Sequence, residues 1–182
     1  MERDEIVALF KKYNKTESLY HHALCVEAVM RHFAKLKGED ENYWGNVGFL
    51  HDVDYELYPD QHCTKCVEIL KEINADDEFI HSIVCHGWGI CSDVKPEKYM
   101  EKVLFTIDEL TGLVYATALL RPTHMEGMSV KSVKKKWKSP TFAAGVNRDT
   151  ITEGAAMLKM ELPELIKNTI EAMSSVSDQI GF

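Results

Sequence analysis

The chain has 182 residues, of which 45% are hydrophobic and 27% charged, which is enough for one ordinary domain with a substantial core. Its net charge of -8 argues against a general nucleic-acid-binding protein, which would be basic, but not against a small phosphorylated substrate, because a bound dication changes the local sign. The first residues lack the pattern of a signal peptide and no apolar run is long enough to span a bilayer, so we expect a soluble, cytoplasmic protein without membrane contact.

Helical periodicity runs through almost every segment. The first third predicts helices over residues 3–13, 19–37 and 41–52, the second of which ends at Gly38. His22 lies beside the buried stripe of that second helix, so its side chain can point inward at the edge of the core.

The middle of the chain predicts further helices over residues 60–73 and 76–86, a polar loop over 88–96, and then the most apolar helix of the protein. Asp108 lies within this last helix, between strongly apolar neighbours. An unpaired carboxylate inside a central helix would be costly, so Asp108 must have a partner.

Several residues predict helix starts. Thr16 or Ser18 can cap the second helix, Pro96 can occupy a first turn, and Thr150 with Glu153 forms the pattern of a capping box.

The last third predicts helices over residues 125–136 and 155–160 and a final one that begins at Pro163. We find no internal repeat and no low-complexity linker. The sequence therefore predicts one all-α domain over residues 1–182.

An adjacent histidine and aspartate follow a short apolar lead-in at Leu50-His51-Asp52. A neutral imidazole offers nitrogen and a carboxylate offers oxygen, and both suit a divalent transition metal. Two ligands do not complete a site, and His22 and Asp108 are the further candidates.

The order His22, His51-Asp52, Asp108 resembles the H…HD…D pattern of the HD-domain superfamily of metal-dependent phosphohydrolases, and its flanking residues are similar to the bacterial HD/HDIG-type hydrolases. The resemblance covers about residues 18–122 and leaves 123–182 as a C-terminal helical extension. It implies a single-domain HD-type helical bundle with the metal site in the core. His22, His51, Asp52 and Asp108 would be the ligands, and the family register favours His22 over the preceding His21.

The resemblance also implies a reaction. One or two divalent ions would lower the pKa of bound water for attack on a small phosphomonoester or phosphodiester, such as a nucleotide. The ligand set suits manganese, iron, cobalt, nickel or zinc, and magnesium less well. Asp52, or Asp54 close to it, could orient the water.

Other residues are candidates for supporting roles. Some HD proteins place further histidines, here His62 and His86, where they bind a second metal or the phosphate, and His86 is also a catalytic candidate. Asp54 and Glu56 could be general bases or partners of the ligands. Arg121 and Lys131, with the lysine run at 134–138, could attract an anionic substrate, although such a run is also typical of a solvated face.

Alternatives to a phosphohydrolase remain open. A catalytically silent HD module could bind metal or a nucleotide for regulation. A di-iron oxygenase of the HD type would need His62 and His86 to hold a second metal. Cys63-x-x-Cys66 is interpreted as small hydrophobic residues with reduced thiols, with a structural zinc site or a redox pair as the alternatives. Gly112 is expected to permit close helix packing.

Overall fold

A computed structural model describes residues 2–182. Over that range the regular structure is helical, which confirms the all-α fold class. In chain order the helices are α1 (Arg3–Tyr13), α2 (Glu17–Lys37), α3 (Glu41–Leu50), α4 (Cys66–Leu70), α5 (Asp77–Val84), α6 (Tyr99–Leu119), α7 (Val130–Trp137), α8 (Arg148–Leu158) and α9 (Leu162–Ser174). Short 3₁₀ turns lie at η1 (Pro59–Gln61), η2 (Lys71–Ile73), η3 (Cys85–Gly87) and η4 (Ser177–Gln179).

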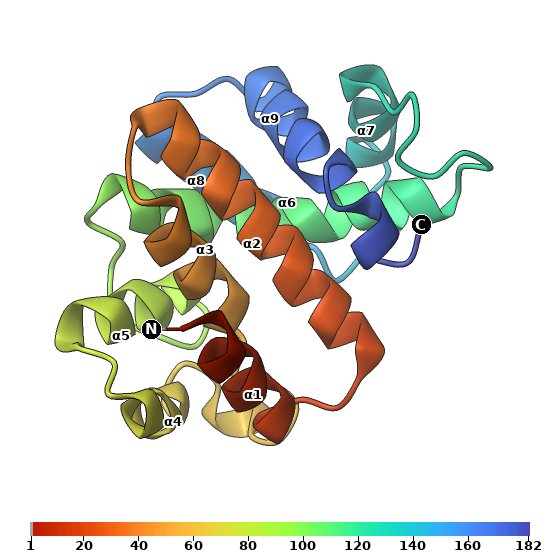
Figure 1. Ribbon diagram of the computed structural model, residues 1–182. Helices are drawn as coiled ribbons and strands as arrows, with labels where there is room; N and C mark the ends of the chain where they lie inside the picture. Colours follow the sequence, from red (N-terminus) through yellow and green to blue (C-terminus); the bar gives the residue numbers. More distant parts are fainter. Residues whose placement is uncertain (1) are drawn as a thin grey trace.

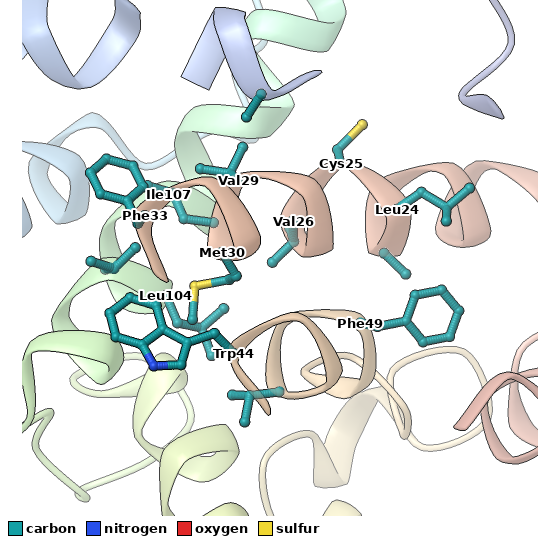
Figure 2. Close-up of a cluster of buried hydrophobic side chains, with 14 of the residues drawn as sticks. Leu24, Cys25, Val26, Val29, Met30, Phe33, Trp44, Phe49, Leu104 and Ile107 are labelled. Atoms are coloured by element: carbon teal, nitrogen blue, oxygen red, sulfur yellow. The ribbon is translucent and has the colours of Figure 1, made fainter. Parts of the chain in front are cut away.

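The two longest helices, α2 and α6, form the centre of the molecule. Figure 1 shows α2 crossing in front of α6, and α2 also packs against α3 and α9. On its other side α6 packs against α8. Their apolar side chains form one continuous core, part of which is shown in Figure 2.

A glycine allows α2 and α3 to approach closely. A Cβ added at Gly48 in α3 would lie 2.8 Å from Met30 Cγ and 3.2 Å from the carbonyl oxygen of Val26, both in α2. Because no side chain stands between the helices there, the end of α3, with His51, lies against the helix that carries His22.

The segment predicted as one helix over residues 60–73 is interrupted. It consists of η1, a turn, the short helix α4 and η2. Cys63 adopts a left-handed φ of 64°, which no continuous α-helix allows. The first amide of α4, that of Cys66, donates to Asp54 Oδ2 at 2.7 Å. This bond joins the segment to the turn after α3, and His62 of the segment also contacts Asp54.

Helix starts differ from the sequence-based expectations where another side chain performs the capping. Thr16 precedes α2 without capping it, because its hydroxyl donates to Glu56, which also accepts the amides of Lys15 and Thr16. The capping box expected at Thr150 is not formed, because Asn147 caps α8.

Two further starts lie later than predicted. Lys98, and not Pro96, precedes α6, and α7 begins only at Val130. No helix within the described residues is both long and apolar enough to cross a membrane.

Candidate metal centre

Four side chains from three separate parts of the sequence converge in the structure. His22 Nε2 lies 3.2 Å from His51 Nε2 and 2.9 Å from Asp108 Oδ1. His51 Nε2 lies 3.3 Å from both Asp108 Oδ1 and Asp52 Oδ2, and His22 Nε2 lies 3.7 Å from Asp52 Oδ2. Two ring nitrogens and two carboxylate oxygens therefore face one another across a single small space.

The helices fix where these atoms point. His22 comes from α2, His51 is the C-terminal cap of α3, and Asp108 lies halfway along α6. His51 Nδ1 is 2.7 Å from the carbonyl oxygen of Gly48, one of the carbonyls that a helix end leaves without an intrahelical partner. When Nδ1–H donates to that carbonyl, the other ring nitrogen, Nε2, is left as an acceptor toward the cluster.

Asp52 faces a second pair of rings as well. Its Oδ2 is directed to His22 and His51, whereas Oδ1 lies 3.4 Å from His62 Nε2 and 3.6 Å from His86 Nε2. Those two ring nitrogens are 3.2 Å apart. One carboxylate therefore lies between two groups of histidines.

The rings of His62 and His86 are oriented in the same way as that of His51, by a contact between Nδ1 and an oxygen atom of the protein. His86 Nδ1 is 2.5 Å from the carbonyl oxygen of Ile83 near the end of α5, and His62 Nδ1 is 2.8 Å from Asp54 Oδ1. The two oxygens of the fully buried Asp54 are thus used by His62 and the Cys66 amide. This position favours the partner role for Asp54, which is not among the residues that line the adjacent cavity.

Charge pairing dominates the protonation of the cluster. Burial lowers the pKa of His51, but the carboxylates of Asp52 and Asp108 outweigh it and hold this pKa well above its usual range. Burial raises the pKa of each carboxyl group, and the rings of His51 and His22 more than offset it, so both carboxyl pKa values lie well below normal. Without a metal, a proton on the His51 ring offsets part of the charge of the two carboxylates.

The donor atoms suit a divalent transition metal. Metal–ligand bonds of about 2.1 Å place neighbouring ligand atoms about 3.0 to 3.4 Å apart, depending on geometry. The measured separations around His22, His51, Asp52 and Asp108 run from 2.9 to 3.7 Å. Mixed imidazole and carboxylate donors at this spacing could hold a metal ion, and His51, Asp52 and His86 form a second such group.

A cavity of about 320 Å³ opens onto the cluster. Besides His22, Asp52, Asp108, His62 and His86, its lining includes Tyr55, Ile90, Cys91, Phe105, Glu109, Gly112, Val146 and Thr150. None of the described residues that line it is a lysine or an arginine. A ligand in the cavity would therefore meet the cluster, the carboxyl group of Glu109 and a partly apolar wall.

Three sequence candidates lie elsewhere. Arg121 donates to the carbonyl oxygens of His124 and Glu126, and so closes the turn after α6. Lys131 lines a separate groove with other lysines of α7. Glu56 binds the start of α2, as described above. The structure does not bring these residues to the cavity.

Sequence reasoning missed the far wall of the cavity. Glu109 directly follows Asp108 and lines the cavity, where burial raises the pKa of its carboxyl group. Gly112 lies one turn further along α6 and has only Val146 Cγ2, at 3.5 Å, near an added Cβ, so it widens the cavity instead of permitting close helix packing. The spacing of residues 108, 109 and 112 could have indicated that they share one face of a helix. The helix that faces them, α8, begins about 40 residues later in the chain, so the sequence did not show the contact.

The five cysteines are free thiols. The sulfur of Cys63 lies 3.0 Å from that of Cys91, a cysteine outside the C-x-x-C pattern that Cys63 forms with Cys66. The hydrogen bond between these thiols lowers the pKa of Cys91 to about 6.

Comparison of the chain with protein-family models, with curated proteins and with solved structures returned no match.

Proposed function

We propose that this protein is a metal-dependent phosphohydrolase of the HD type that acts on a small phosphomonoester or phosphodiester, such as a nucleotide. The observation that carries the proposal is the convergence of His22, His51, Asp52 and Asp108 at the floor of an open cavity. A divalent ion held there supplies a Lewis acid and lowers the pKa of a bound water. Manganese, iron, cobalt, nickel and zinc suit these donors better than magnesium does.

Charge counting favours two ions when the substrate is a phosphate. Asp52, Asp108 and Glu109 line the cavity and Asp54 stands behind His62, which makes four carboxylates close to the site. One dication leaves excess negative charge, whereas two dications carry four positive charges and neutralise the set. Because no lysine or arginine is found among the described lining residues, a phosphate would rely on these ions for its binding energy.

The chain's own residues have distinct roles in this proposal. His22, His51, Asp52 and Asp108 would hold the first ion, and His62 and His86 with Asp52 would hold the second. Glu109 is the remaining carboxyl group on the cavity wall, where burial raises its pKa, and it would exchange a proton with substrate or water. Asp54 positions His62 and does not face the substrate.

A di-iron oxygenase is the second candidate. It requires His62 and His86 to hold a second ion, and the structure places both rings against Asp52. The partly apolar cavity, with no basic side chain among its described lining, suits an uncharged organic substrate. A silent binding module is less well supported, because it has no need for two sets of oriented rings.

The test combines elemental analysis with two activity assays. Protein loaded separately with manganese, iron, cobalt, nickel or zinc is tested on a panel of phosphomonoesters, phosphodiesters and nucleotides, and the iron form is tested for oxygen consumption. We expect hydrolysis by the loaded wild type and a loss of at least about 100-fold in Asp52→Asn, because even changes to the outer partners of metal ligands cost about 10- to 100-fold.

Glu56→Gln is the matched control, since it removes an acid four residues away that does not line the cavity. It should keep the activity. Oxygen consumption without phosphoester hydrolysis would replace the phosphohydrolase by the oxygenase, and neither activity in fully loaded protein would favour the binding module.

A further inference from the structure

Two cysteines from separate segments meet at the edge of the candidate metal centre. Cys63 follows η1 and Cys91 lies in the loop after η3, and their sulfur atoms are 3.0 Å apart. Cys63 is buried, with 3% of its surface exposed, whereas Cys91 is exposed and lines the cavity. The pair therefore has one sulfur that small molecules can reach and one that is shielded behind it.

The backbone on both sides is shaped to bring these sulfurs together. Cys63 has a φ of 64°, an uncommon conformation for a residue with a side chain, and such a conformation persists only where the surrounding structure enforces it. Cys91 lies in a tight turn in which the carbonyl oxygen of Gly87 accepts the amides of Ile90, Cys91 and Ser92 at 3.0 to 3.1 Å.

Gly87 also supplies the space that the pair occupies. A Cβ at this position would collide with the sulfur atoms of both Cys63 and Cys91. Any side chain other than hydrogen would therefore separate the thiols. The left-handed cysteine and the turn that begins at Gly87 come from two separate segments of the backbone and act on the same two sulfur atoms.

We propose that Cys63 and Cys91 form a reversible disulfide, so that the pair is an oxidation site of the protein. With hydrogen peroxide as the oxidant, the exposed Cys91 sulfur attacks the O–O bond and becomes a sulfenic acid, and one water is released. The Cys63 sulfur then attacks the Cys91 sulfur, the S–OH bond breaks, and a second water leaves. Together the two thiols lose two electrons and two protons, which reduce one peroxide to two waters. The sulfurs need to approach by only about 1 Å to reach bonding distance.

The bond would join the two segments that carry the second pair of rings. His62 immediately precedes Cys63, and the turn that holds Cys91 begins directly after His86. Cys63 Sγ lies 3.9 Å from His86 Nε2, so the disulfide would form beside the ring and not across the cavity. Closing the chain between residues 63 and 91 should also restrict the unfolded state and so stabilise the oxidised protein.

The test is thiol counting and peptide mapping of the full-length protein. After mild peroxide treatment we expect two of the five thiols to disappear together, a non-reduced digest to contain a Cys63–Cys91 linked peptide, and dithiothreitol to restore all five. The midpoint of thermal unfolding should rise on oxidation and fall back on reduction. Cys91→Ser changes an exposed residue, so it should fold normally while it abolishes both the linked peptide and the shift in unfolding.

Cys25→Ser is the matched control, because Cys25 is buried in α2 and should leave the linkage unchanged. The proposal is overturned if the linked peptide joins Cys63 to Cys66, or if Cys91 is oxidised to a sulfinic acid while Cys63 stays free. Because the readout is the thiol chemistry itself, it does not depend on which reaction the metal centre performs.

Discussion

Asp54 has both carboxylate oxygens occupied, although it is buried and close to other acids. One oxygen faces His62 Nδ1 and the other accepts the Cys66 amide. A carboxylate that accepts from an imidazole N–H fixes the tautomer of that ring and makes its other nitrogen a better metal ligand. At the scale of single residues, the centre thus consists of ligands and of the groups that orient them.

Asp54→Asn tests this role. The amide has nearly the same shape, but its NH₂ group would face either the His62 ring or the Cys66 amide, both of which are donors. We expect the affinity of the His62–His86 side for metal to fall by about 10- to 100-fold, while the His22–His51 side keeps its affinity. Calorimetric titration with manganese or zinc measures the two events, and an equal loss at both would contradict the assignment.

Pairs of helices determine the shape of the cavity. α6 carries Asp108, Glu109 and Gly112 along one side, and that side is closed by Thr150 of α8 and by Val146 just before it. The two helices approach most closely where Gly154 of α8 lies against Thr106 of α6, since a Cβ at Gly154 would lie 2.7 Å from Thr106 Cβ and closer still to its hydroxyl. The cavity wall therefore depends on a contact outside the cavity.

Gly154→Ala should push the two helices apart. Overpacking of this kind costs about 1 to 3 kcal/mol, so the free energy of unfolding should fall by that amount in urea titrations. Gly112→Ala on the facing helix is the control. It has room for a methyl group, and alanine favours helix over glycine by about 1 kcal/mol, so its stability should be unchanged or higher.

The two variants should also differ at the site. The Gly112→Ala methyl group projects toward the cavity, and substrate binding should weaken without loss of stability. If both variants lost the same stability, the close contact at Gly154 would not be what joins α6 to α8.

At the scale of the whole molecule, the candidate metal centre joins elements from most of the chain. α2, α3, α6 and the segments around η1 and η3 each contribute a candidate ligand. A metal bound there would therefore stabilise the assembled fold, by about 2.7 kcal/mol when the free ion is at 100 times its dissociation constant.

The stabilisation by metal should depend on pH in a defined direction. His51 has a raised pKa in the folded metal-free protein, so its charge pairing contributes below its ordinary pKa and is lost as the pH rises through the folded value. Asp52 and Asp108 have lowered pKa values, so their contribution is present above their ordinary values and is lost as the pH falls through the folded ones. A metal must displace the ring protons, so its affinity falls at low pH.

Thermal unfolding of metal-free and metal-loaded protein measures this effect. The rise in midpoint on adding manganese or zinc should be large near pH 8 and shrink toward about pH 5, where protons compete for the rings. Asp52→Asn should show only a small rise throughout. A metal-induced shift that does not change with pH would mean that these histidines are not the ligands.

How much the sequence determines can be judged from particular residues. Helical periodicity is a local property, so α1, α2 and α6 could be predicted closely, with Gly38 in the expected left-handed conformation after α2. The ligands His22, His51, Asp52 and Asp108 could be chosen because each stands at a distinctive position in an apolar context and their order resembles a known pattern. Local spacing also required that Asp108 have a partner, without showing where.

Only the tertiary structure decided which residues share the centre and which do not. The break at Cys63, the capping of α2 by Glu56, the placement of Asp52 between two pairs of rings, and the meeting of Cys63 with Cys91 all join residues from different segments. The energy of a pair contact depends on a distance in space, which periodicity along one helix does not contain. For that reason the chain alone determined its helices and its principal candidate ligands, whereas packing determined the second pair of rings, the cavity wall and the thiol pair.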